Sequence, residues 1–448
     1  MNVQFFGGAR SVTGANYLLR TDNHTILVDC GLHQGSNFCE RLNFEPFPYD
    51  PAKIDAVLVT HAHIDHTGRI PQLYKAGFRG SIFSTYPTRD FAEILLIDSE
   101  GILAKEAQKA HRPLLYDEAD VHDVMKLWKG VEYHEPLTLG DATITFFNAG
   151  HILGSASIEI RNKGKKIVFS GDLGNNPPPI IERTEFLGDA DYCLIESTYG
   201  DRLHKDDPAF KNTLEDIIEE TVKAKGVLLI PAFAMERVQK LLFELNELME
   251  HGRIPRVPIF LDSPLAIKLT DVYKKYERYF NSETQFLIKG GDAIFEFHGL
   301  RATQSTEESK AINDIPAPKV IIAGSGMSHG GRIVHHERRY LSDPKSTIVF
   351  VGYQAAGSLG RHILEGRKVV RIAGEDVQVH CRVVSVPGYS AHADQAQLID
   401  WLTSMRQSLK KVFVVQGEEI PAITLARKIR DELAINTHIP ELGEKVEL

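Results

Sequence analysis

The sequence predicts a mixed α/β protein in which the pattern of strands and helices changes twice along the chain. The first 200 residues alternate short β-rich segments with loops. From about residue 206 helical patterns alternate with buried strands, and after about residue 370 strands return. Closely spaced strands indicate sheets packed on one another, whereas strands separated by helices indicate a parallel sheet. The chain of 448 residues is long enough for two or three domains.

The strands of the first region are short and rich in β-branched and aromatic residues. They are expected at 3–6, 16–20, 25–29, 56–60, 81–84, 143–147, 155–161, 166–170 and 192–196, with a helix at 67–76. In the second region the expected helices are 209–224, 234–250 and 265–276, and the expected strands are 227–230, 259–261, 320–323 and 347–351. The polar segment 299–318 predicts a mobile loop. A helix from Asp394, a strand at 412–415 and a helix from Ile420 complete the chain.

Composition places the chain among soluble globular proteins. Hydrophobic residues make up 43% and charged residues 25%. No apolar run reaches the roughly 18 residues of a membrane span, and no signal peptide is recognised, so we expect a cytoplasmic protein with no membrane association. The four cysteines form no CxxC pair, which argues against a disulfide framework. A net charge of −9 argues against a DNA-coating role but does not exclude a nuclease, because bound cations supply local positive charge.

A compact histidine and aspartate motif, HAHIDH, begins at His61, directly after the strand expected at 56–60. His61 and His63 are two apart in extended chain, so their side chains point the same way and can bind one ion. Asp65 and His66, at the turn into a helix, can reach a second ion. Neutral imidazole and carboxylate form the donor set that suits zinc with open coordination positions. The motif therefore predicts a metal site, although a single histidine more often has a core or surface role.

Three further residues follow glycine-rich or strand-end patterns. His151 lies in the glycine turn 150–155, Asp172 follows the strand expected at 166–170, and Asp29 ends the strand at 25–29. Each pattern alone is more often an ordinary turn. Together with HAHIDH, however, they resemble the metallo-β-lactamase superfamily. The resemblance implies one or two Zn²⁺ ions and the following ligands: His61, His63 and His151 for the first ion, Asp65 and His66 for the second, Asp172 as a bridge, and Asp29 as a supporting carboxylate.

Other segments resemble the β-CASP branch of that superfamily, whose members are nucleases related to the cleavage-and-polyadenylation endonuclease subunit and its bacterial counterparts. These segments are LIESTYG at 194–200, PAFAMER at 231–237, LDSPL at 261–265, GSGM at 324–327 and GYSAHAD at 388–394. The resemblance covers nearly the whole chain. It implies an αββα sandwich split in sequence by an inserted β-CASP α/β domain. The expected division is 1–204 and 369–448 for the sandwich and 205–368 for the insert, with Glu196 and His392 in the family's motifs A and B.

Phosphodiester cleavage needs a nucleophile, stabilisation of phosphoryl charge and a proton for the leaving oxygen. A metal-bound hydroxide supplies the first, and a metal pair roughly 3.5–4 Å apart supplies the second. A histidine oriented by a carboxylate can supply the third. His392 backed by Glu196 is the candidate acid, against the simpler interpretation of a helix-entry residue. The candidate catalytic residues are His392, Glu196 and Asp65.

The glycine-rich segment 324–332 follows an expected strand and precedes a helix. Its backbone N–H groups could hold a substrate phosphate, with Ser325, Gly326 and Arg332 as the candidate residues. A tight turn with no ligand explains the glycines equally well. The neighbouring polar residues are expected to form a solvated helix face: His335, His336, Arg338 and Arg339.

Gln416 departs from the family pattern. The family carries a second-metal histidine at this strand end in RNA-acting members and valine in DNA-acting members. An amide oxygen is a poorer zinc ligand than imidazole, so Gln416 is a doubtful ligand. The second ion is then weak, absent, or better supplied by Mn²⁺ or Mg²⁺.

These observations predict a metal-dependent ribonuclease, with endonuclease or 5′-exonuclease activity on single-stranded RNA. The alternatives are a DNA nuclease or small phosphodiesterase of the same fold, and a non-catalytic RNA-binding subunit. Against the last, the six ligand positions and both positions of the acid pair carry competent residues. A homodimer is left open by the sequence.

Overall fold

The computed structural model describes residues 1–35, 40–204, 210–355, 357–386 and 390–448. It divides into two compact units, Met1–Leu203 with Ala391–Leu448, and His204–Ser390. The first unit is therefore discontinuous in sequence, as expected. Within the described residues, no helix combines the length and the apolar character that crossing a membrane requires.

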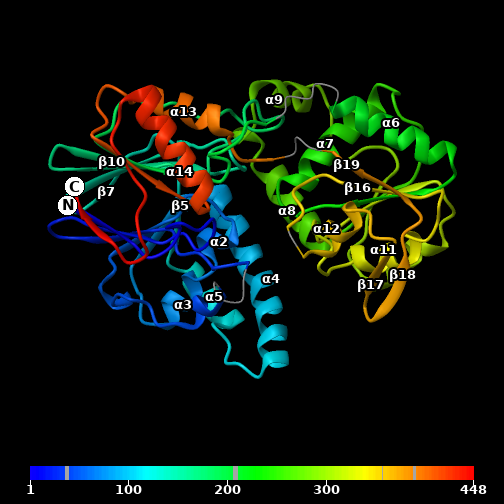
Figure 1. Ribbon diagram of the computed structural model, residues 1–448, viewed down its shortest axis with the longest axis horizontal. Coiled ribbons are helices and arrows are strands. Elements are labelled where there is room, and N and C mark those ends of the chain that lie inside the picture. Colours follow the sequence, from blue (N-terminus) through cyan, green and yellow to red (C-terminus); the bar gives the residue numbers. More distant parts are fainter. Residues whose placement is uncertain (36–39, 205–209, 356, 387–389) are drawn as a thin grey trace. The chain divides into compact units, whose positions relative to one another are not determined.

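The first unit contains two seven-stranded sheets (Figure 1). Its N-terminal sheet has the order β22-β1-β2-β3-β4-β5-β6, and its second sheet has the order β21-β20-β11-β10-β9-β8-β7. The bounds of the first set are β1 Asn2–Phe5, β2 Tyr17–Arg20, β3 Thr25–Val28, β4 Ala56–Leu58, β5 Ser81–Thr85, β6 Trp128–Val131 and β22 Lys445–Glu447. Those of the second are β7 Leu137–Leu139, β8 Ala142–Asn148, β9 Ala156–Asn162, β10 Lys165–Phe169, β11 Tyr192–Glu196, β20 Lys411–Val415 and β21 Thr437–His438.

The two sheets bury one shared core between them. Phe5 and Leu58 of the N-terminal sheet pack in the same cluster as Ile158, Phe169 and Phe413 of the second. Strand β8 alternates buried and half-buried positions along its length, the pattern of a strand with one face on a core. The result is a sandwich whose inner faces are apolar.

Helices cover the outer faces of the sandwich (Figure 1). On the second sheet these are α13 (Gln395–Thr403) and α14 (Glu419–Lys428), which bury Trp401 and Leu425 against its outer face. On the N-terminal sheet they are α2 Ile64–Thr67, α3 Ile70–Lys75, α4 Tyr86–Ala110 and α5 Glu118–Met125. The helix expected at 67–76 is thus two short helices, α2 and α3, separated by Gly68 and Arg69. The 25-residue α4 was not expected, because its sequence carries only a weak apolar stripe.

The second unit is built on a parallel sheet of order β14-β13-β15-β12-β16-β19. Strands β12 and β15 are buried at every position, as strands covered by helices on both faces are. The strands are β12 Val227–Pro231, β13 Ile259–Asp262, β14 Leu300–Ala302, β15 Lys319–Ala323, β16 Thr347–Phe350 and β19 Arg382–Ser385. The helices are α6 Phe210–Lys223, α7 Arg237–Glu250, α8 Pro264–Lys275, α9 Ser282–Lys289, α10 Thr306–Ala311, α11 Ile333–Tyr340 and α12 Leu359–Leu364.

Two features of this unit differ from the sequence expectation. The segment expected to be a mobile loop, 299–318, instead forms β14 and α10, and α10 begins with a capping box between Ser305 and Glu308. Residues 369–386, which we expected in the returning domain, belong to the second unit. They form the hairpin β17 (Val369–Ile372) and β18 (Glu375–Gln378), and β19, which pairs with β16.

Candidate metal centre and active site

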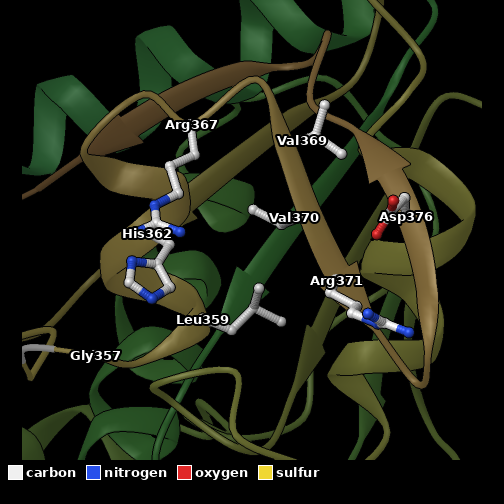
Figure 2. Close-up of a pocket in the computed structure, with 8 residues that line it drawn as sticks. All are labelled: Gly357, Leu359, His362, Arg367, Val369, Val370, Arg371 and Asp376. Carbon is white, nitrogen blue, oxygen red and sulfur yellow. The ribbon is translucent and has the colours of Figure 1, made fainter.

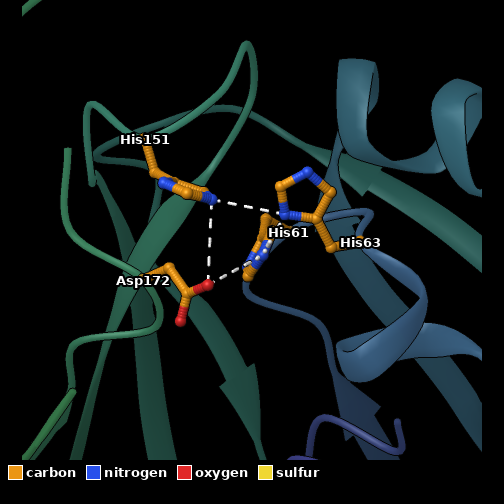
Figure 3. Close-up of side chains that lie close together, drawn as sticks. All are labelled: His61, His63, His151 and Asp172. Atoms are coloured by element: carbon orange, nitrogen blue, oxygen red, sulfur yellow. Dashed lines mark hydrogen bonds and ion pairs between the residues drawn. The ribbon is translucent and has the colours of Figure 1, made fainter. Parts of the chain in front are cut away.

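Four side chains from three loops of the first unit point to one spot (Figure 3). His61 Nε2 lies 3.1 Å from His63 Nδ1, and His151 Nε2 lies 3.3 Å from the same atom. Asp172 Oδ2 lies 3.5 Å from His61 Nε2 and 3.7 Å from His151 Nε2. We call these four residues the first site.

The local sequence explains how each side chain reaches this spot. His61 and His63 follow β4, with His63 capping helix α2. His151 stands in a turn where Gly150 has a φ of +68° and where an added Cβ would lie 2.6 Å from the Thr184 backbone nitrogen. Glycine is therefore required at that position. Asp172 follows β10, so all four residues lie in loops at the ends of neighbouring strands.

In His61 and in His151, hydrogen bonds determine which ring nitrogen is protonated and which carries a lone pair. Thr60 Oγ1 donates to Asp29 Oδ2 at 2.8 Å, so it accepts from His61 Nδ1 at 3.1 Å. His151 Nδ1 donates to the Ala391 carbonyl at 3.2 Å. Both Nε2 atoms are then unprotonated and face the first site. Burial lowers the pKa of His63 to about 4, which keeps this third imidazole neutral as well.

The first site fits a divalent metal ion. Nitrogen ligands of tetrahedral zinc lie about 2.0–2.1 Å from the ion, which places them about 3.3 Å from each other. The nitrogen separations of 3.1 and 3.3 Å match this spacing. With His63 Nδ1 also unprotonated, three lone pairs converge on one point, which is the arrangement that a bound cation needs. Asp172 Oδ1 is in addition buried and accepts no hydrogen bond from the described residues.

The expected residues of the second metal position also lie beside Asp172. His66 Nε2 is 3.4 Å from Asp172 Oδ1 and 3.9 Å from Asp65 Oδ2, and we call this place the second position. Asp29 Oδ2 contacts His66 Nδ1 at 2.7 Å on the other side of the ring. The amide nitrogen of Gln416, not its oxygen, lies 3.1 Å from His66 Nε2.

His392 and Glu196 form a pair at the edge of the first site. His392 Nδ1 lies 3.3 Å from Glu196 Oε1 and 3.8 Å from Asp172 Oδ2. Glu196 is fully buried, and its Oε1 also accepts a hydrogen bond from the Leu173 backbone N–H at 2.7 Å. Burial lowers the pKa of His392, but the carboxylates, Glu196 foremost, outweigh burial and raise the pKa to about 9. The histidine is therefore protonated at neutral pH.

The candidate phosphate loop belongs to the second unit. Ser325 N–H donates to the Gly330 carbonyl, and Ser325 Oγ accepts from the His329 N–H. Gly326 is required by packing, since an added Cβ would lie 2.7 Å from the ring of Phe233. Arg332 donates to Asp262 Oδ1, to the Thr303 carbonyl and to the Gln304 carbonyl at 2.7–2.9 Å. These contacts tie the loop to the end of β13, and a phosphate contact by this loop stays a prediction.

A carboxylate cluster in the same unit escaped sequence analysis. Asp262 is fully buried and accepts hydrogen bonds from Thr303 Oγ1, Ser309 Oγ, Arg332 Nη1 and His336 Nε2 at 2.6–2.7 Å. The expectation that His336 lies on a solvated helix face is wrong, because its side chain is 3% exposed. Asp262 and His336 are 74 residues apart, so no local spacing links them.

The second unit also contains a cavity of about 440 Å³ between α12 and the β17–β18 hairpin (Figure 2). It is lined by Gly357, Leu359, His362, Arg367, Val369, Val370, Arg371 and Asp376. Two arginines and one aspartate give its wall a positive balance, but among the described residues it lacks the converging buried donors that the first site has.

A two-sheet sandwich with a histidine and aspartate cluster at its strand ends defines a metallo-hydrolase of the metallo-β-lactamase fold. Comparison with protein families agrees. Residues 18–192 match the metallo-β-lactamase superfamily domain, residues 238–363 the Beta-Casp domain, and residues 376–440 the Zn-dependent metallo-hydrolase RNA specificity domain. The chain belongs to the β-CASP family of metallo-β-lactamase proteins.

Individual relatives span nearly the whole chain. A ribonuclease of Thermus thermophilus is 40% identical over 95% of both chains. The transcription termination factor FttA of Methanosarcina mazei is 33% identical over 98% of this chain and 70% of its own. An RNase J-like protein of Methanocaldococcus jannaschii is 31% identical over 98% of both chains. The fold is shared with a crystal structure of a protein of unknown function from Enterococcus faecalis, at a TM-score of 0.58 and 12% identity, covering 100% of this chain and 99% of that chain.

Proposed function

We propose that this protein is a metal-dependent ribonuclease that hydrolyses phosphodiester bonds in single-stranded RNA. One observation carries the proposal: the His392–Glu196 pair lies beside a cluster of three imidazoles and a carboxylate, 3.8 Å from Asp172. A proton donor and a metal site thus stand together, as hydrolysis of a poor leaving group requires. RNA as the substrate is supported by the ribonuclease relative and by the match of residues 376–440 to an RNA specificity domain.

The metal of the first site is zinc in this proposal. Three neutral imidazoles and one carboxylate form a borderline-soft donor set, which zinc prefers over magnesium or calcium. Bound there, the ion would act as a Lewis acid and lower the pKa of a bound water toward 7. His61, His63, His151 and Asp172 would hold it.

His392 supplies the proton for the leaving 3′ oxygen. Glu196 lies on the Nδ1 side of the ring and is itself fixed by the Leu173 N–H, so the ring orientation is set by buried atoms. A pKa of about 9 keeps the ring protonated at neutral pH until the leaving oxygen becomes a stronger base. The proton then passes from Nε2 to that oxygen, and Glu196 stabilises the charge while the ring holds it.

The test compares matched single strands of RNA and DNA with identical sequence. Zinc-loaded protein should cut the RNA, and protein stripped with a chelator should lose this activity and regain it with zinc. His61→Ala, purified in parallel, controls for contaminating nucleases. RNA binding should weaken with added salt, because contacts with phosphates release counterions.

Three outcomes would replace the proposal. DNA cut as fast as RNA favours a DNA nuclease. Hydrolysis of a small phosphodiester with both polymers intact favours a phosphodiesterase. RNA binding without any cleavage favours a non-catalytic subunit. Product lengths over time distinguish an endonuclease from a 5′-exonuclease. A cytoplasmic location and a homodimer stay predictions.

A further inference from the structure

The backbone of Gln416 is held from both sides at the end of β20. Its N–H donates to the Gly8 carbonyl at 2.7 Å, and its carbonyl accepts from Ser197 N–H and Thr198 Oγ1, each at 3.2 Å. Its φ of +47° lies in the left-handed region, which directs the side chain away from the strand. The residue is buried. The direction of its side chain is therefore determined by main-chain contacts.

The orientation of the amide follows from its partners. The nitrogen Nε2 lies 2.9 Å from the carbonyl oxygen of Val12, which can only accept a hydrogen bond. The Tyr17 hydroxyl donates to Oε1 at 3.2 Å. Burial raises the pKa of Tyr17 well above its usual value, so this hydroxyl keeps its proton. Exchanging the two amide atoms would place two acceptors face to face at Val12, so the nitrogen must occupy this side.

The same amide nitrogen faces the imidazole that the second position needs. Nε2 of Gln416 lies 3.1 Å from His66 Nε2, while His66 Nδ1 lies 2.7 Å from Asp29 Oδ2. His66 Nδ1–H donates to the carboxylate, so the lone pair of the neutral ring lies on Nε2 and accepts from the amide. While the amide donates to it, this lone pair faces Gln416 and is not offered to a metal ion.

We propose that Gln416 closes the second metal position, so that this chain holds a single ion in the first site. The amide N–H group takes the place of the second ion on His66. The oxygens that remain, on Asp65 and Asp172, are too few to replace the lost imidazole at a zinc site. Gln416 is then a positioning residue, because it acts on the metal centre through His66 and Asp29. The inference rests on the proposed function only where it takes the first site to be a metal site.

Metal counting tests this inference without any measurement of activity. The full-length protein is loaded with excess zinc, and separately with manganese, then desalted and analysed for metal per chain. We expect one ion per chain in the wild type. Gln416→His replaces the donor with a lone pair and should raise the count to about two. Electron paramagnetic resonance of the manganese form should change from an isolated ion to a coupled pair.

Two further variants complete the design. Gln416→Glu keeps the side-chain length and replaces the amide nitrogen with an oxygen, so it should also admit a second ion if Gln416→His folds poorly. Gln407→His adds a histidine at an exposed position of the same unit and should leave the count at one.

Each outcome decides for or against the inference. Two ions per chain in the wild type, with a coupled manganese signal, would overturn it. A count of one in the wild type and in both Gln416 variants would show that something other than Gln416 closes the position. A count of zero in the wild type would instead contradict the first site and the proposed function. Failure to cut RNA with one bound ion would contradict the proposed function alone.

Discussion

Asp172 of the first unit and Asp262 of the second are both buried, and they differ in how hydrogen-bond donors are placed around them. Asp262 of the second unit receives four hydrogen bonds at 2.6–2.7 Å. Asp172 of the first unit is surrounded by nitrogens of four histidines at 3.4–3.8 Å, and its Oδ1 accepts no hydrogen bond from the described residues. Burying a carboxylate without a partner is costly. The hydrogen bonds within the second unit meet this cost for Asp262, whereas the surroundings of Asp172 are suited to a bound cation.

The two clusters use the same residue types, aspartate and histidine, for different purposes: one stabilises the fold and the other is suited to binding a metal ion. Burial alone would raise the pKa of Asp262, but hydrogen bonds from His336, Ser309, Thr303 and Arg332 lower it. That cluster needs nothing further. The cluster around Asp172 has converging ring nitrogens and a carboxylate oxygen without a hydrogen bond, and a bound cation would satisfy both. We expect substitutions in the two clusters to have different consequences.

The largest effect is expected for Asp172→Ala. Losing the one carboxylate of the first site should reduce bound zinc to trace levels and RNA cleavage to the background of the assay, because metal binding and water activation depend on the same ligand. The fractional loss in the free energy of unfolding should be smaller than the fractional loss of RNA cleavage. Metal analysis, RNA cleavage and urea unfolding of one preparation measure all three. If this variant retained zinc, Asp172 would not be a required metal ligand, and the contrast with Asp262 would be wrong.

His392→Ala should lower turnover by about 10²–10⁴-fold, the usual contribution of a positioned proton donor, and leave zinc content unchanged. His122→Ala is the matched control, because His122 lies on the exposed side of α5 and should affect neither quantity. Zinc content and single-turnover cleavage decide the matter. Loss of zinc from His392→Ala would indicate that His392 is a metal ligand. Its assignment as a proton donor outside the metal site would then be wrong.

Asp262→Ala should cost about 3–5 kcal/mol of the free energy of unfolding, because it leaves a half-buried arginine and a buried histidine without their carboxylate. Zinc bound per folded chain should stay at the wild-type value, because the first site draws no residue from this unit. Urea unfolding and metal analysis of the folded fraction test both points. If Asp262→Ala had wild-type stability but bound no zinc, the structural role assigned to the Asp262 cluster would be wrong.

The effect expected for Glu337→Gln is confined to one range of pH and is smallest near pH 5. Burial raises the pKa of Glu337 to about 8, so the folded protein holds its proton more tightly than the unfolded chain does. The stability contributed by this group is complete below the unfolded pKa near 4.5 and is lost as the pH rises through about 8. Glu337→Gln should therefore match the wild type at pH 5 and be more stable at pH 9. Glu307→Gln, at an exposed position, should show no such difference.

The first site could be predicted from sequence because its residues lie in short motifs at strand ends. HAHIDH, the turn at Gly150 and the carboxylate after β10 each carry a local signal. The Asp262 cluster could not be predicted, because His336 and Ser309 reach it only through packing. The orientation of the Gln416 amide was equally hidden. It depends on the carbonyl of Val12, which is 404 residues away in sequence.

Glu196 and His392 stand 196 residues apart, on either side of the whole second unit. All four residues of the first site are synthesised before the second unit is begun. At a synthesis rate of roughly 5–20 residues per second, His392 follows roughly 10–40 s later. Strand β20, which lies beside β11 in the second sheet, and β22, which pairs with β1, arrive later still. During synthesis the nascent chain thus carries the four residues of the first site for many seconds before His392 is added, and under the proposed function we expect no cleavage before that.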